Sequence, residues 1–259
     1  MKNIEVKVLN PEAVCEARKM MAFTARLTQR GEKIKDMDDL LALYDKSHSV
    51  ELINTLSALP HPTLQKFEVV NVAIVGASRR FLAQITRHQN EVKFMSASLQ
   101  YSDYSDDGAF VVPYEIMEQG EIAQMRFLDN CKRSMFEYKQ AIEIGLNSDT
   151  AGYLAPQALS NVLIISATPY QWKHMIGQRT CRRNTSETRY VMLRIWEKLF
   201  ELDSVLFSFE TTAPYCERDG ICPEGRMSCG DPLDREANGV YTPAPSDLVA
   251  IDFPLLAEQ

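Results

Sequence analysis

A run of nine residues, FEVVNVAIV at positions 67–75, constrains the fold more than any other stretch of this chain. Valine and isoleucine dominate it, and their branched side chains favour a β-strand. Gly76 follows, and residues 78–88 then carry apolar side chains at the spacing of a helix face. We therefore expect a strand that leads through a glycine into a helix, as in folds where helices pack on a sheet.

The same two periodicities locate the other elements. Strands are predicted at 4–8 and 162–167. Helices are predicted at 12–27, 36–44, 50–58, 114–146 with a bend near Gly120, 150–159, 169–179 and 184–202. Helices outnumber strands, so the predicted fold class is α/β in the broad sense (α+β). We expect one domain over residues 1–230, followed by a C-terminal extension, 231–259, whose four prolines suit an arm on a neighbouring subunit.

Composition narrows the class of protein. The chain has 259 residues, of which 45% are hydrophobic and 24% charged, enough to bury a substantial core. A net charge of −7 argues against a general nucleic-acid binder, so no nucleic-acid partner is expected. The polar start of the chain does not resemble a signal peptide, and no apolar run is long enough to span a membrane. The six cysteines form no CxxC pair, which favours reduced thiols in a cytoplasmic protein.

Three cysteines near the C-terminus leave two interpretations open. Cys216, Cys222 and Cys229 lie in CERDGICPEGRMSC and would bind zinc if a fourth ligand joined them. Their spacing is not that of a zinc ribbon or finger. We therefore favour a thiol-containing loop and predict no metal.

Two polar segments are candidates for ligand binding. The first, 87–105, opens with Arg, His, Gln and Asn at the predicted end of a helix, where cations are favoured. The second, TCRRNTSETR at 180–189, is either a solvated helix start or an anion site in which several guanidinium groups meet a helix N-terminus. The familiar signatures of zinc peptidases, P-loop proteins, serine hydrolases and dinucleotide-binding folds do not occur.

Four segments occur in an order that resembles the flavin-dependent thymidylate synthases. They are HPT followed by FE, QITRHQ with SASLQYS, WKHMIGQR, and TCRRNTSETR with CPEGRMSCG, together spanning roughly residues 10 to 230. The resemblance implies the family's α/β fold, a mixed sheet flanked by helices, and a homotetramer with FAD held where subunits meet. It also implies reductive methylation of dUMP to dTMP, with methylenetetrahydrofolate as carbon donor and NADPH to recharge the flavin. No protein cysteine attacks the base in this family.

The resemblance assigns roles by position. The residues that resemble flavin-contacting ones are Thr63, Arg87, His88, Gln89 and His174, and His61 resembles a histidine near the folate and flavin rings. The residues that resemble the substrate-contacting set are Gln84, Arg87, Ser98, Leu99 and Gln100. Arg179 resembles the arginine on the uracil ring of dUMP and is the predicted catalytic residue.

The sequence departs from the family pattern at several positions. One extra residue precedes Ser98, Gln100 stands in place of a phosphate-binding Arg, and another such Arg falls near Gly152. Thr168 and Tyr170 replace an Asn and an Arg. Candidate replacements for the missing cations are Arg80, Arg182 and Arg183. Two alternatives therefore stay open: a flavin and folate enzyme acting on a different pyrimidine nucleotide, for example by hydroxymethylation, and an inactive nucleotide-binding homologue.

Overall fold

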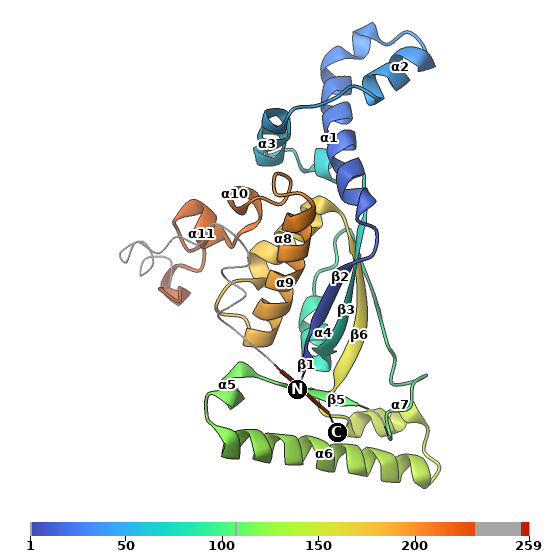
Figure 1. Ribbon diagram of the computed structural model, residues 1–259, viewed down its shortest axis with the longest axis vertical. Helices are drawn as coiled ribbons and strands as arrows, with labels where there is room; N and C mark the ends of the chain where they lie inside the picture. The colour runs from blue at the N-terminus through green and yellow to red at the C-terminus, as the bar shows by residue number, and fades with distance from the viewer. Residues whose placement is uncertain (1, 107, 231–254, 259) are drawn as a thin grey trace.

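The computed structural model describes residues 2–106, 108–230 and 255–258, and its centre is a four-stranded sheet (Figure 1). The strand order is β2-β3-β6-β4, and every pairing is antiparallel. The strands are β2 Glu5–Val8, β3 Val70–Ser78, β4 Val92–Ser96 and β6 Ser160–Ala167. The predicted α/β class is confirmed, but the sheet is antiparallel rather than mixed. Helix α4 (Arg79–Ile85) returns the chain to the end of the sheet where β3 began. Strands β3 and β4 are therefore parallel to each other, and β6 lies between them and is antiparallel to both.

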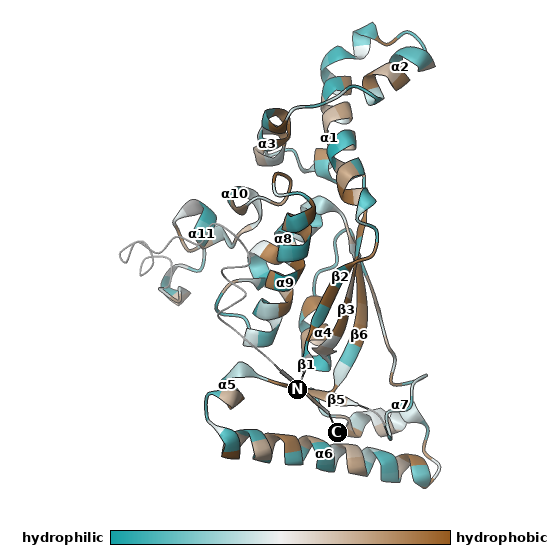
Figure 2. Cartoon of the chain, viewed as in Figure 1, coloured by the Kyte–Doolittle hydropathy of each residue, from teal (hydrophilic) through white to brown (hydrophobic). Residues whose placement is uncertain are grey.

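Helices cover one face of this sheet. The three closest are α4, α8 (Pro169–Arg179) and α9 (Ser186–Leu202), as Figure 1 shows. Alternate residues of β3 and β6 point into the core, and Figure 2 shows the apolar colouring along these strands. A buried tryptophan on each of α8 and α9 donates a hydrogen bond to a backbone carbonyl outside its helix. Trp172 Nε1 donates to the Val70 carbonyl at 3.0 Å, and Trp196 Nε1 donates to the Phe207 carbonyl at 2.9 Å.

The opposite face of the sheet is apolar and uncovered within the described part of the chain. Val75 lies opposite Val162, and Ile164 lies opposite Met95. These four side chains are exposed, from 38% for Ile164 to 73% for Met95. A sheet normally buries an apolar face, so this surface has the character of an interface.

The remaining helices form two outlying groups. At one end of the sheet are α1 Glu12–Arg30, η1 Gly31–Lys33, α2 Met37–Tyr44, α3 Val50–Ala58 and η2 Pro62–Gln65. Beside the candidate site lie α10 Phe209–Thr212, α11 Tyr215–Asp219 and η4 Gly225–Met227. No helix in the described residues is long and apolar enough to cross a membrane.

A second, smaller sheet closes the other end. It has the order β1-β7-β5, from β1 Lys2–Asn3, β5 Ala109–Val112 and β7 Leu255–Glu258. Its helices are α5 Tyr114–Met117, α6 Glu121–Glu143, α7 Ser148–Ala151 and η3 Gly152–Leu154. Of the predicted C-terminal extension, 231–254 and 259 lie outside the described residues, and 255–258 pair within this chain.

Several predicted boundaries were wrong for local reasons. The predicted helix 114–146 is two helices, because Gly120 has φ 88° and separates α5 from α6. The predicted helix 150–159 does not continue past η3, because Pro156 lacks a backbone N–H and disfavours helix in the residue before it. The strand predicted at 67–75 continues to Ser78 through a bulge at Gly76, where φ is 92°.

Candidate functional site

The segment after α4 and one face of α8 form a polar hollow of about 340 Å³. It is lined by Arg87, His88, Gln89, Asn90, Gln171, His174, Gln178 and Arg179. The structure therefore brings together five of the residues singled out in the sequence, from segments some 90 positions apart. Among the described residues that line the hollow, two carry guanidinium groups and none carries a carboxylate, which suits an anionic or carbonyl-bearing ligand.

Arg179, at the end of α8, is held by three acceptors. Its Nε donates to His88 Nε2 at 2.9 Å, and one terminal nitrogen, Nη2, donates to the Gln84 carbonyl at 3.1 Å. The other, Nη1, donates to Asn184 Oδ1 at 3.4 Å. Among the described residues these bonds use three of the five guanidinium N–H groups, so two remain for a ligand. Burial and the nearby charge of Arg87 both lower the pKa of Arg179.

His88 is neutral in this arrangement. Burial, then the charges of Arg179 and His174, lower its pKa to about 4. Its Nε2 must be unprotonated to accept the Arg179 hydrogen bond, so the ring proton lies on Nδ1. The His174 ring meets the His88 ring edge-on at 5.9 Å, and burial lowers the pKa of His174 too. Arg87 and Arg179 thus carry the hollow's positive charge.

A buried carboxylate fixes α4 against α9. Glu187 accepts from the Ser78 backbone N–H at 2.6 Å and from the Ser78 hydroxyl at 2.5 Å. The same hydroxyl accepts from the Phe81 N–H and so caps α4. Burial raises the pKa of Glu187, and its hydrogen bonds to Ser78 oppose the shift. At the other end of α4, Gln84 Oε1 accepts from the Thr188 hydroxyl, so α9 sets where α4 ends.

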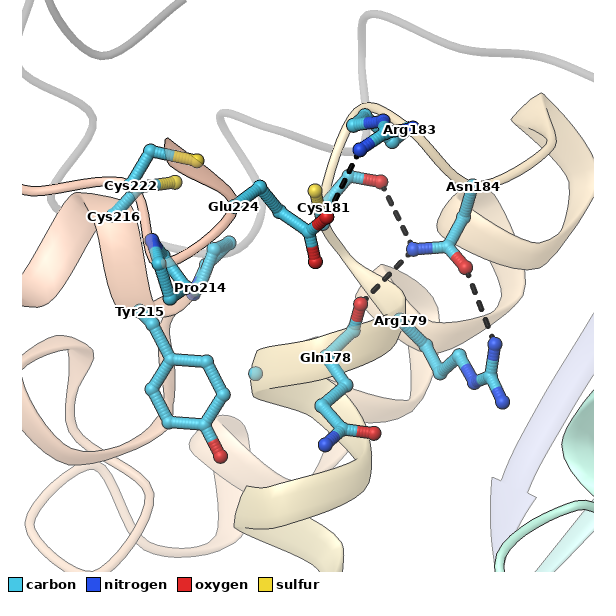
Figure 3. Close-up of a pocket in the computed structure, with 12 residues that line it drawn as sticks. Gln178, Arg179, Cys181, Arg183, Asn184, Pro214, Tyr215, Cys216, Cys222 and Glu224 are labelled. Carbon is cyan, nitrogen blue, oxygen red and sulfur yellow. Dashed lines mark hydrogen bonds and ion pairs between the residues drawn. The ribbon is translucent and has the colours of Figure 1, made fainter. Parts of the chain in front are cut away.

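A second hollow, of about 590 Å³, shares Gln178 and Arg179 with the first (Figure 3). Its far wall comes from the segment 214–224. There the Tyr215 hydroxyl lies 3.1 Å from His174 Nδ1. Tyr215 and Asn184 line this hollow and were not predicted individually, because the C-terminal segment has no periodicity and the segment 180–189 was interpreted only as a helix start or an anion site. The pairing of a tyrosine with a ligand-facing histidine is visible only in the fold.

Four thiols gather beside this second hollow. Cys181, Cys216, Cys222 and Cys229 line one small cavity, and all are free. Burial, then the charges of Glu217 and the other three cysteines, raise the pKa of Cys216 to about 12. The described residues contain no group of three His, Cys, Asp or Glu side chains arranged to hold a metal ion.

The other predicted site residues lie elsewhere in the chain. His61 and Thr63 are exposed at η2 and do not line the hollow. Ser98, Leu99 and Gln100 follow β4, which begins just after the hollow and leads away from it. Five strand residues at roughly 3.3 Å each put these three residues roughly 15 Å away. Within one chain, Arg87 and Arg179 line the hollow together with predicted flavin-contacting residues, whereas His61, Thr63 and residues 98–100 do not line it.

The positions that depart from the family pattern have structural roles. A Cβ at Gly152 would lie 3.1 Å from the Leu99 side chain, so a larger residue at this position would require Leu99 to shift. The Thr168 hydroxyl caps α8 by accepting from the Gln171 N–H. Lys66 lies over the Tyr170 ring at 4.9 Å.

Sequence comparison places the chain in one protein family. The family described as "Thymidylate synthase complementing protein" (Thy1) matches residues 12–203, and this chain belongs to it. Flavin-dependent thymidylate synthases are among its relatives. That of Pyrococcus furiosus is 25% identical over 173 residues, covering 63% of this chain and 68% of that protein. That of Geobacter sulfurreducens is 23% identical over 211 residues, covering 81% and 88%.

Two solved structures share the fold. The UMP/dUMP methylase PolB from Streptomyces cacaoi, bound with 5-Br dUMP, has a TM-score of 0.61 at 16% identity and covers 80% of this chain and 94% of its own. Thymidylate Synthase X from Helicobacter pylori, with FAD and dUMP, has a TM-score of 0.55 at 15% identity and covers 80% and 97%. At this identity the two structures support the fold alone.

Proposed function

We propose that this protein is a flavin-dependent thymidylate synthase that converts dUMP to dTMP by reductive methylation. The observation that carries the proposal is the set of contacts around Arg179, in a hollow with two guanidinium groups and no carboxylate. The hollow's donors, Arg87, Gln89 and Arg179 among them, suit the phosphates and ring carbonyls of FAD and a pyrimidine nucleotide. Family membership and the activities of the relatives support the assignment.

In this proposal the protein's own groups position and stabilise charge. Arg87, His88, Gln89 and His174 would hold FAD, which would supply the hydride once NADPH has reduced it, and methylenetetrahydrofolate would supply the carbon. Hydride arriving at C6 of a uracil drives electron density toward C5 and the carbonyl oxygens. Arg179 has two N–H groups free of the described contacts, and they can stabilise that charge without reorganising. Neutral His88 keeps Arg179 in place because it accepts from Nε without adding a second charge.

The active enzyme in this proposal is a homotetramer with its sites at subunit interfaces. The first support is the separation within one chain of His61 and Thr63, the hollow, and Ser98 to Gln100. A homotetramer would bring these sets together from different copies. The second support is the uncovered apolar face of the central sheet, around Val75 and Met95.

The test is direct. Purified protein is expected to be yellow with a flavin spectrum, to run as a tetramer in gel filtration, and to form dTMP from dUMP with methylenetetrahydrofolate and NADPH. A colourless monomer that gains no spectrum when FAD is added would remove the proposal. An FAD-loaded tetramer that binds dUMP but turns over no pyrimidine nucleotide would be an inactive nucleotide-binding homologue.

A different pyrimidine nucleotide is the second candidate substrate. Gln100 and Gly152 stand where the family pattern has phosphate-binding arginines, so two cations of that pattern are absent. The Leu99 side chain lies against Gly152. Mass spectrometry of products from dUMP, UMP and dCMP would separate a methylated from a hydroxymethylated base. Equal inactivity toward all but dUMP would exclude this candidate.

A further inference from the structure

A row of side chains crosses the sheet at the end farther from the hollow. Asn161 of β6 pairs with Ala77 of β3. On its other side, β6 pairs with β4 up to Leu163 and Ser96, and the Ala97 N–H then donates to the Val162 carbonyl at 2.9 Å. Continuing this antiparallel register by two residues places Ser98 opposite Asn161.

These side chains share the helix-covered face. Asn161 is buried, as are Leu163 and Ile165, which point to the same face of β6. Phe94 packs against the buried apolar core between the sheet and its helices. Side chains alternate along a strand, so Ser98 lies on the same face as Phe94. Arg79 joins them as the residue after Ser78, and its N–H donates to the Leu159 carbonyl at 3.0 Å. Strand β6 lies between β3 and β4, so two strand spacings, roughly 10 Å, separate the Arg79 and Ser98 backbones, and the long Arg79 side chain can approach a ligand bound at Ser98.

Two donors in this group are buried and have no hydrogen-bond partner among the described residues. They are Nη1 of Arg79 and Nδ2 of Asn161, whose residue is only 5% exposed. The other end of the Asn161 amide is used, because its Oδ1 accepts from the Val162 N–H at 2.8 Å. Buried donors are nearly always satisfied in folded proteins, so each of these two calls for an acceptor.

The charge at this place favours an anion. Burial lowers the pKa of Arg79, and the neighbour that acts against this shift is the Tyr104 hydroxyl rather than a carboxylate. Ser98 adds a further donor, because its hydroxyl oxygen accepts from the Gln100 N–H at 3.0 Å and its hydrogen stays available.

We propose that Arg79, Asn161 and Ser98 form a binding site for a phosphate monoester, and that it holds the 5′-phosphate of the nucleotide substrate. This inference rests on the proposed function for the nucleotide and on the geometry for the site itself. A guanidinium group grips phosphate oxygens in a bidentate way, and the asparagine N–H and serine hydroxyl fix the remaining oxygens. The site stands in for the cations absent at Gln100 and Gly152.

The other candidate replacements fit less well. Arg80 is exposed, and Arg183 is paired with Glu224 at 2.9 Å beside the second hollow. Arg80 therefore makes a matched control, since it is the adjacent residue of the same helix with the same charge.

The experiment compares Arg79→Met and Arg79→Lys with Arg80→Met, all as the full chain loaded with FAD. Calorimetry gives the Kd of dUMP and of inorganic phosphate, and kinetics give KM and kcat. For Arg79→Met we expect the Kd and KM of dUMP to rise at least tenfold and phosphate binding to be lost. Arg79→Lys is expected to fall between Arg79→Met and wild type, and Arg80→Met to match wild type. FAD content and the spectrum should be unchanged in all of them.

Each alternative outcome identifies what fails. If Arg79→Met binds dUMP and phosphate as wild type does, or if Arg80→Met shows the loss instead, the proposed phosphate site is wrong. If Arg79→Met does not fold, Asn161→Leu and Arg79→Lys still test the site, and normal phosphate binding in both would overturn it. If phosphate binding depends on Arg79 but no nucleotide is converted, the site stands and the proposed function fails. A wild type that binds neither phosphate nor dUMP overturns the site.

Discussion

The neutral state of His88 gives a quantitative prediction for stability in acid. Its pKa is about 4 in the folded protein against an ordinary value of 6.5. Because the folded value is the lower one, the unfolded chain takes up the proton first as the pH falls. The stabilisation is therefore fully present above about pH 6.5 and is lost progressively as the pH falls toward about 4. At about 1.4 kcal/mol per pKa unit, the loss is about 3 kcal/mol. His88 is 8% exposed, so solvent screens little of it.

The matched variant is His88→Gln, whose amide oxygen can accept from Arg179 and does not titrate. Urea unfolding of both proteins, followed by circular dichroism between about pH 7 and about pH 4, gives the difference in their free energies of unfolding. Carboxylates common to both proteins cancel in that difference. We expect wild type to lose about 3 kcal/mol relative to the variant across this window. A difference that stays constant to within about 0.5 kcal/mol would refute a neutral, buried His88.

Four further predictions test other contacts. Arg179→Ala should keep FAD and the fold but lose at least ~10²-fold in turnover, while NADPH oxidation without nucleotide changes much less; near-normal turnover would reduce Arg179 to a helix-end residue. Arg87→Lys should weaken flavin or nucleotide binding more than tenfold, at least about 1.4 kcal/mol by titration, and unchanged titrations would make it a structural surface residue. Glu187→Ala leaves the buried Ser78 N–H unpaired and should cost about 1–3 kcal/mol in chemical unfolding, whereas no cost would mean that water replaces the carboxylate. Cys222→Ser should turn over within a few-fold of wild type, and a stable, flavin-loaded but inactive protein would indicate thiol or metal chemistry.

Local signals predicted the helices next to the site well. The predicted range 169–179 matches α8, because Thr168 caps it and Pro169 begins it. Helix α9 begins two residues later than predicted, after the cap at Thr185. In contrast, β5 was missed because its four residues are held by β7, which lies more than 140 positions later. A pairing at that separation leaves no local pattern in the sequence.

The candidate site likewise contains residues that a local motif carries and residues that only the fold brings in. Arg87 and His88, which one motif carries, lie at the hollow beside residues of α8, and their predicted contacts with a flavin stay a prediction. Tyr215 was not predicted, because its contact with His174 depends on how an aperiodic segment folds back. Arg79 and Asn161 were not predicted either, since the pairing of Asn161 with Ala77 and the hydrogen bond from the Arg79 N–H to the Leu159 carbonyl join segments that lie far apart in the sequence.

The central position of β7 in the smaller sheet has a consequence for the order of folding. Strands β1 and β5 each pair with β7, which joins the first residues of the chain to its last ones (Figure 1). A ribosome makes residues 2–3 and 109–112 long before 255–258, so both outer strands must wait for the middle one. The central sheet is complete by Ala167 and can form during synthesis, whereas the smaller sheet closes only after residues 255–258 have been made.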